Sequence, residues 1–360
     1  MSLLAVLPAE LLDAICEPLS GHSSSLAALA RTCAALAPSA TRVLYCSISV
    51  NAYARTLPAV LTLAARPSLA ALVRCFSIIL DDSTELPLFP AYYVQLRTAL
   101  AYMHNLSHLD VLVPALASWV LAPPGSQPSP IYTHLEYFAC AFPLDSCTSA
   151  FLARTPALRA LQLSASPSPT PVLLPSTYIP LLSSYTGPAS LLPLLSSRPL
   201  TALHLAGDLA SENVFSQAEA SLAEDEHGPA GARVQVLSAI TSGAPAEFLA
   251  ALAHAYPALV CLRVMTTCAF WDTPDMTCYT RIASILASLP NLAAFELSGM
   301  HWEARPKASS PVSAAPGPEK EWISPPVTPR TAHELAADPA LAVEGRESEL
   351  AAEFAAWGYY

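Results

Sequence analysis

A short phrase recurs along the chain and limits the folds that it can adopt. Each copy has a turn residue, a leucine, two variable positions, an apolar residue, one variable position and a second apolar residue. The six copies lie at Asn105–Val111, His134–Cys140, Pro156–Leu163, Pro199–Leu205, Pro257–Val264 and Pro290–Leu297. Apolar residues at alternate positions predict a short strand with one buried face.

Apolar helical stretches precede several copies, as at Phe248–Ala255 and Ile282–Leu289. A proline or asparagine follows, and the residue before a proline disfavours the helical conformation, so each helix is expected to stop there. The unit is therefore a helix, a stop and a short strand. Such a unit cannot bury its own apolar face, so neighbouring units are expected to stack.

This unit resembles the repeat of leucine-rich-repeat proteins. The expected fold class is α/β, with an irregular right-handed α/β leucine-rich-repeat-like solenoid over residues 51–302. The spacing between copies is irregular, and a chain so rich in leucine produces some matches by chance. A non-repetitive α/β domain is therefore the alternative.

The first fifty residues predict three short helices that lead into a strand. Leu7, Leu11 and Ile15 recur at helical spacing, and Gly21 marks a helix end. Serines at 23–25 offer caps for a second helix, and Pro38 suits the first turn of a third. From residue 44 to residue 50 the apolar positions alternate, which indicates a strand.

The residues of this segment resemble the F-box motif. The resemblance is carried by the run Leu7-Pro8-x-Glu10-Leu11-Leu12-x-x-Ile15, by the later pair Thr32-Cys33 and by the terminal pair Leu44-Tyr45. Two departures are Tyr45, where tryptophan is common, and a serine-rich connection over 20–25 that lacks an acidic residue.

An F-box implies a docking module for a Skp-type adaptor, which links it to a cullin-RING ubiquitin ligase. The adaptor contact of the family falls on Leu7, Pro8, Leu11, Leu12 and Ile15. The alternative is an ordinary three-helix cap that buries all its leucines internally. Three short helices cannot bury every face among themselves, which favours a surface left over for a partner.

The strand phrases also predict a working surface on the opposite face of the sheet. Its polar positions lie between the two apolar residues of a phrase: Asp110, Gln162, His204, Arg263 and Glu296. Their mixed polarity suits a target protein better than a ligand of one charge sign. The alternative is that they are merely solvated strand positions.

The charge of the chain excludes several functions. A net charge of -11, with 17 basic and 28 acidic residues, leaves no basic field for a nucleic-acid backbone. Lys307 and Lys320 are its lysines, and both stand in a proline- and serine-rich stretch, which is no place for a phosphate-binding or Schiff-base lysine. This scarcity fits codon bias, or a receptor that avoids modifying itself.

No catalytic, cofactor or metal-binding residues are expected. The nine cysteines form no C-x-x-C pair, and Cys261, Cys268 and Cys278 lack zinc-type spacing. His104 and His108 are expected on different elements, and Asp81-Asp82 reads as a solvated turn. Without a signal-peptide pattern or an unbroken apolar span, an intracellular protein with reduced thiols and no membrane contact is expected.

The proposed division of the chain is as follows. Residues 1–50 form the F-box-like helices, 51–302 the solenoid, 303–330 a flexible Pro/Ser-rich segment and 331–360 a helical segment with a helix over Glu344–Trp357. Within the solenoid, Leu163–Pro199 is expected to be an irregular excursion and Glu219–Arg233 a solvated loop. The expected function is that of a non-catalytic substrate receptor of a Skp-cullin-F-box type ubiquitin ligase. The alternative is a leucine-rich-repeat scaffold without a ligase role.

Overall fold

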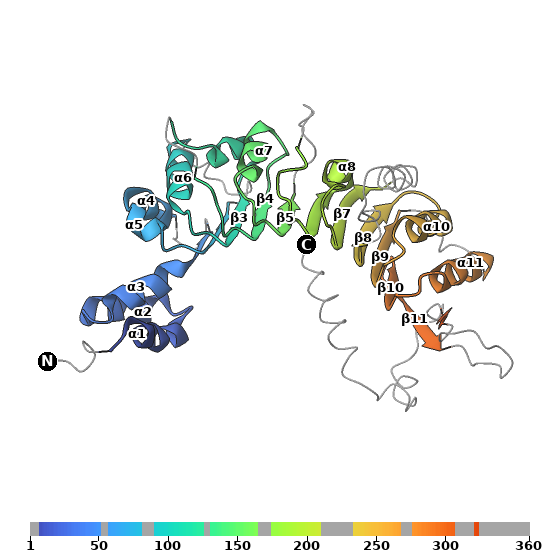
Figure 1. The fold of residues 1–360 in the computed structure, drawn as a ribbon, viewed down its shortest axis with the longest axis horizontal. Helices are drawn as coiled ribbons and strands as arrows, with labels where there is room; N and C mark the ends of the chain where they lie inside the picture. Colours follow the sequence, from blue (N-terminus) through green and yellow to red (C-terminus); the bar gives the residue numbers. More distant parts are fainter. Residues whose placement is uncertain are drawn as a thin grey trace.

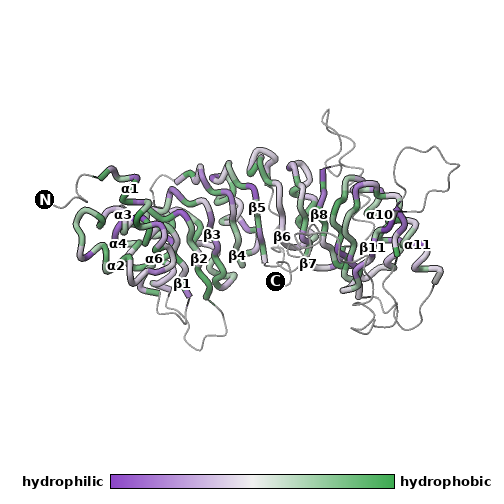
Figure 2. The backbone as a smooth tube through the Cα atoms, turned by 90° about the horizontal axis from the view of Figure 1, so that it is seen from below, coloured by the Kyte–Doolittle hydropathy of each residue, from purple (hydrophilic) through white to green (hydrophobic). Residues whose placement is uncertain are grey.

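The chain folds into a mixed α/β structure built on one long, open sheet. The computed structural model describes residues 7–51, 57–80, 90–125, 130–164, 174–209, 233–267, 276–306 and 320–323. Within these ranges the sheet has twelve strands, and their spatial order is their order in the chain (Figures 1 and 2). Strands β1 to β10 are parallel, whereas β11 and β12 are antiparallel to their neighbours.

The strands are short, as the phrase predicts. They are β1 (Ser47–Asn51), β2 (Cys75–Ile79), β3 (His108–Leu112), β4 (Tyr137–Cys140), β5 (Ala160–Leu163), β6 (Ser184–Pro188), β7 (Ala202–Asp208), β8 (Val236–Thr241), β9 (Cys261–Thr266), β10 (Ala294–Leu297), β11 (Met300–Pro306) and β12 (Lys320–Ile323). All six copies of the phrase end in one of these strands, so the six predicted strands are confirmed.

Helices cover one face of the sheet and lie on the outer side of its curve (Figure 1). They are α4 (Pro58–Ala65), α5 (Pro67–Ala70), α6 (Pro90–Tyr102), α7 (Ser146–Leu152), α8 (Leu192–Leu195), α10 (Pro245–Ala255) and α11 (Met276–Ala287), with 3-10 helices η4 (Ala115–Leu121) and η5 (Ala189–Leu191). Helix α10 contains the predicted stretch from 248 to 255, and α11 overlaps the one from 282 to 289. Both helices are therefore confirmed.

The core lies between these helices and the inward face of the sheet. One residue of each strand from β2 to β10 belongs to a continuous lateral row of directly paired, buried side chains: Phe76, Leu109, Phe138, Leu161, Tyr185, Leu203, Leu237, Leu262 and Phe295. Side chains of the covering helices, such as Leu96 and Phe248, belong to the same buried cluster. Each strand therefore buries its apolar side against its neighbours, as expected for stacked units.

The first fifty residues form the three expected helices. They are α1 (Ala9–Cys16), α2 (Ser23–Thr32) and α3 (Ala37–Cys46), with a short 3-10 helix, η2 (Glu17–Leu19), after α1. Helix α3 includes residues 45 and 46, so strand β1 starts at residue 47, later than the alternation from residue 44 indicates.

These helices have a small core of their own. Its buried members are Leu12, Cys16, Leu26, Leu36 and Ala40. Leu44 packs against this small core, whereas Tyr45 already packs against the large core of the sheet. The change from one core to the other therefore falls between two consecutive residues near the end of α3.

The segment from 163 to 199 is more regular than expected. Instead of an irregular excursion, its described part contains strand β6 and helix α8. Strand β6 departs from the phrase because Gly187 stands where the second apolar residue is expected. A Cβ atom on Gly187 would lie 2.7 Å from the hydroxyl of Tyr185 and 2.8 Å from the carbonyl oxygen of Leu163. The tyrosine and the backbone therefore occupy the space of the missing side chain.

The last described strands form an antiparallel extension of the sheet. Ser298 and Gly299, with φ of +46° and +85°, make the two-residue turn between β10 and β11. Such turns match the twist of a hairpin. The prediction of a flexible segment over 303–330 is wrong for residues 303–306 and 320–323, which pair with each other. The ammonium of Lys320 donates to the carbonyl oxygens of Pro290 and Leu292 at 3.2 and 3.1 Å.

Several predictions fall on residues outside the described ranges. They concern Asp81-Asp82, Cys268, Lys307, the loop from 219 to 232 and the helical segment from 331 to 360. Among the described helices, none has the length and apolar character needed to cross a membrane.

Candidate functional site

Helix α1 presents an apolar stripe to solvent. Leu11 and Ile15 are 52% and 45% exposed, and Pro8 and Pro18 are exposed too. Positions 8, 11, 15 and 18 recur every three or four residues, so they follow one side of the helix and the short turn after it. We call Pro8, Leu11, Ile15 and Pro18 the α1 stripe. Pro18 was not among the predicted contact residues, although its spacing fits the same helical face.

Two of the predicted contact residues turn inward instead. Leu12 is only 9% exposed and is a member of the small core, and Leu7 is half-buried against that core. The burial of Leu12 disagrees with the prediction that it contacts a partner. The reason is the helical repeat, which places Leu12 and Cys16 on the side of α1 that faces α2 and α3.

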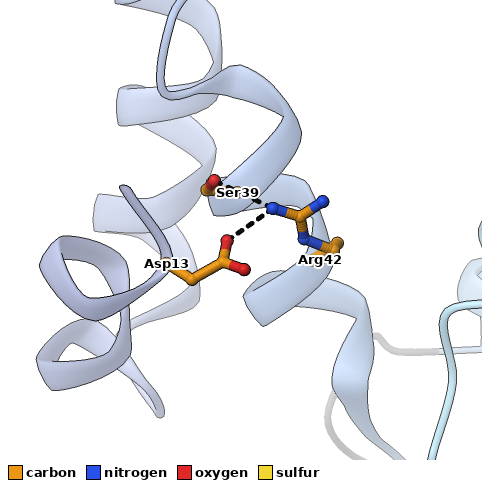
Figure 3. A network of polar contacts seen from close by, with 3 residues as sticks. All are labelled: Asp13, Ser39 and Arg42. Carbon is orange, nitrogen blue, oxygen red and sulfur yellow. Dashed lines mark hydrogen bonds and ion pairs between the residues drawn. The ribbon is translucent and has the colours of Figure 1, made fainter. Parts of the chain in front are cut away.

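An ion pair links α1 to α3 (Figure 3). The helical repeat places Asp13 on the opposite side of α1 from the stripe. The guanidinium of Arg42 donates to Asp13 at 2.6 Å and to the hydroxyl of Ser39 at 3.1 Å. Hydrogen bonds from Arg42 and then Ser39 hold the pKa of Asp13 below its usual value. Both charged side chains are 43% exposed, so the pair contributes about 0–1 kcal/mol and mainly orients the helix.

The five predicted working-surface residues share one lateral row on the face of the sheet that the helices do not cover. Direct strand pairing links the members in the order Ser77, Asp110, Ala139, Gln162, Thr186, His204, Ser238, Arg263 and Glu296. We call these nine residues the open-face row. Residues far apart in the sequence are thus brought side by side, because parallel strands in the same register align equivalent positions.

Asp110 has an unusual environment within this row. The hydroxyl of Ser77 donates to its Oδ2 at 3.2 Å, whereas its Oδ1 is buried and has no hydrogen-bond partner. Burial raises the pKa of this carboxyl above its usual value, and the hydrogen bond from Ser77 opposes that shift. None of the ion pairs among the described residues includes Asp110.

Two aromatic rings lie on the same face of the sheet as Asp110, two residues before the row positions of their strands. His108 and Tyr137 are directly paired on β3 and β4, and their rings stack with centroids 5.9 Å apart and planes at 26°. The Tyr137 hydroxyl donates to Oε1 of Gln162 at 3.1 Å. The sequence prediction did not include these rings, although their position two residues before the row residue places them on the same face.

Burial also sets the charge of the histidine in the row. Desolvation lowers the pKa of His204 below its ordinary value of 6.5, so this imidazole is uncharged at neutral pH. His204 therefore contributes polarity to the open-face row but no positive charge.

The far end of the row carries a paired charge. Arg263 and Glu296 lie on adjacent strands, with Nε of the arginine 3.2 Å from Oε1 of the glutamate. The distance makes an ion pair, although the Nε–H bond does not point at the oxygen well enough for a hydrogen bond. Glu296 is only 4% exposed, so the prediction that it is an exposed position is wrong. Its pairing with Arg263 compensates the buried charge.

Removal of the arginine from this pair is expected to destabilise the sheet. Arg263→Met leaves the buried carboxylate of Glu296 without its cation, so the free energy of unfolding should fall by about 1–3 kcal/mol. Glu296→Gln in the Arg263→Met background should recover most of the loss, because the buried charge is then gone. Urea denaturation followed by circular dichroism measures the stability of the wild type and of both variants. An Arg263→Met protein as stable as the wild type would contradict this account.

The described residues offer no metal centre. No group of three or more histidine, cysteine, aspartate or glutamate side chains among them is placed to hold an ion. His104 follows helix α6, whereas His108 lies in β3, so the two are on different elements, as predicted. None of the eight described cysteines is in a disulfide.

Two surface features stand out at different places along the molecule (Figure 1). They are the exposed α1 stripe and the open-face row, whose members are half-buried apart from the buried Ala139 and Glu296. The α1 stripe is apolar, and the open-face row with its neighbouring rings is polar and aromatic. Groups of these kinds are common in protein interfaces. Comparison with known proteins gives no match to a family model and none to a curated protein.

Proposed function

We propose that the chain is the substrate-recognition subunit of a Skp-cullin-F-box type ubiquitin ligase. Helices α1 to α3 are its F-box and dock a Skp-type adaptor, and the following units form an irregular right-handed leucine-rich-repeat-like solenoid. The open-face row of that solenoid holds a target protein. The chain acts inside the cell, in the cytoplasm or the nucleus, where such ligases work.

The observation that carries this proposal is the α1 stripe. Leu11 and Ile15 stay exposed although the opposite side of the same helix belongs to a complete small core. A helix that is anchored on one side and apolar on the other supports docking by the exposed side. The stripe contains three of the five residues that the F-box resemblance assigns to the adaptor contact: Pro8, Leu11 and Ile15.

The proposed role is one of proximity and not of chemistry. A receptor that holds a target beside a charged ubiquitin-conjugating enzyme raises the local concentration of the target's lysines there. The chain itself then needs no catalytic residues. The alternative function is a leucine-rich-repeat scaffold that binds proteins through the open-face row without a ligase, since that row does not depend on α1.

Binding to a Skp-type adaptor separates the two functions. The purified full chain is mixed with a purified Skp-type adaptor at micromolar concentrations and analysed by size-exclusion chromatography and calorimetry. The receptor proposal expects a stable complex of one chain with one adaptor. A folded chain that binds no adaptor under these conditions would overturn the receptor function and favour the scaffold.

A further inference from the structure

We propose that Asp110, together with the rings of His108 and Tyr137, forms a site for an arginine side chain of the partner protein that binds the open-face row. The inference deepens the proposed function, on which it rests for the idea that a target occupies this face. It names the chemistry that a target must offer at one position.

The carboxylate of Asp110 has one oxygen without a partner. Asp110 is half-buried, and the hydroxyl of Ser77 is the donor that contacts it, whereas Oδ1 is enclosed without a partner. An unpaired buried oxygen costs free energy that a cationic donor would recover. The terminal torsion of an aspartate is soft, so rotation about it brings either oxygen toward an incoming ligand.

Asp110 differs from the other titratable acidic and histidine residues of the open-face row. Glu296 is also buried, but Arg263 of the same chain neutralises it. His204 is uncharged at neutral pH. Within the open-face row, Asp110 is therefore the acidic group without an ion-pair partner, and a cation from outside complements it. The net charge of -11 favours the approach of a basic segment as well.

The aromatic rings beside Asp110 favour arginine over lysine. The stacked rings of His108 and Tyr137 lie on the same face as Asp110 and next to it along the strands. A guanidinium is planar and weakly hydrated, so it stacks on an aromatic ring while its N–H groups reach a carboxylate. An ammonium is a compact, strongly hydrated charge and gains less from such a surface. The combination of carboxylate and rings therefore selects arginine.

The test begins with a random peptide library displayed on phage and selected on the immobilised full chain. We expect arginine to be enriched at one position of the selected peptides. One selected sequence is then synthesised with arginine, lysine or citrulline at that position, and the three affinities are measured by fluorescence anisotropy. We expect the arginine peptide to bind about tenfold tighter than either of the others.

Two variants of matched charge change locate the effect. Asp110→Asn keeps the shape of the side chain but removes its charge, so the arginine and citrulline peptides, which can both stack on the rings, should then bind about equally. Glu136→Gln removes an exposed carboxylate immediately before β4, outside the row, and should leave the arginine preference intact. Tyr137→Leu should bring the arginine peptide close to the lysine peptide, because the stacking surface is lost.

Several results would overturn the inference. They are a library without arginine enrichment, a lysine peptide that binds as well as the arginine peptide, or a preference for arginine over citrulline that survives Asp110→Asn. In the last case Asp110 does not form an arginine site. Adaptor binding is measured on the same proteins. Failure of the wild type to bind the adaptor would overturn the receptor function and leave the peptide preference as a separate result.

Discussion

Replacement of Leu11 and Ile15 with aspartate will abolish capture of a Skp-type adaptor by the full chain while the chain stays folded. Exposed apolar anchors at the centre of an interface are worth about 2 kcal/mol or more each, and about 1.4 kcal/mol corresponds to a tenfold change in affinity. The two replacements together should therefore lower the affinity by roughly 700-fold or more. Calorimetry with the purified adaptor measures the loss. Pro8→Ala combined with Ile15→Asp should also abolish adaptor capture, because it replaces a second pair of α1-stripe residues that shares Ile15 with the first.

The burial of these residues makes the result interpretable. Leu11 and Ile15 lie outside the small core, so their replacement should change stability by less than about 0.5 kcal/mol. Leu116→Asp in η4 is the matched control, because Leu116 is 94% exposed and lies away from the α1 stripe. Adaptor affinity that survives in the Leu11/Ile15 variant, or that falls equally in the Leu116 control, would place the docking face elsewhere.

The second large effect is expected from Gly187→Leu, a change that restores the strand phrase in β6. It should lower the free energy of unfolding by about 3 kcal/mol, because overpacking and a strained backbone both oppose the new side chain. Its Cβ would meet the Tyr185 hydroxyl at 2.7 Å and the Leu163 carbonyl oxygen at 2.8 Å. Urea denaturation followed by tryptophan fluorescence or circular dichroism measures the loss.

Two further variants show whether the backbone contact or the tyrosine causes this loss. Tyr185→Leu in the same chain removes the hydroxyl but leaves the Leu163 carbonyl oxygen in place, so it should not restore the wild-type stability. Gly243→Ala is the control for loss of a glycine, because its Cβ would make only an ordinary contact at 3.4 Å with Thr241. A Gly187→Leu protein as stable as the wild type would show that β6 has room for the phrase after all.

Gly187 also explains why this strand escapes sequence analysis. The phrase needs two apolar residues at alternate positions, and β6 offers Tyr185 and then glycine in a stretch full of proline and serine. Strand β2 has the alternation in Phe76 and Ile78, but no turn residue precedes it, and β8 ends its alternation on Ala239. The phrase therefore misses β6 and β8 because a small residue stands at the second apolar position, and misses β2 because no turn residue precedes it.

The open-face row could be predicted because the period of a strand is two. Alternation alone places Asp110, Gln162 and the other row residues on the face away from the leucines. It does not give the register between strands, and that register decides which side chains meet. The ion pair of Arg263 with Glu296 and the stack of His108 on Tyr137 both depend on cross-strand pairing. The burial of Glu296 was missed for this reason.

For the helices near the N-terminus, too, local sequence predicts the elements but not how they pack. Their number and positions follow from apolar spacing and caps, so α1, α2 and α3 appear where expected. The side of α1 that each leucine takes depends on where α2 and α3 pack against it. Leu11 is therefore exposed, whereas the adjacent Leu12 is buried in the small core.

The Ser298-Gly299 hairpin has a consequence for how far the described sheet extends. A parallel array can grow by one more crossover unit as long as the edge of its last strand is open. The hairpin folds β11 back onto that edge, so the next unit has nothing to pair with. Strand β12 is only four residues long and begins with the charged pair Lys320 and Glu321. Short, charged edges resist joining to another chain. The hairpin thus ends the parallel part of the described sheet and leaves a short, charged strand at that end.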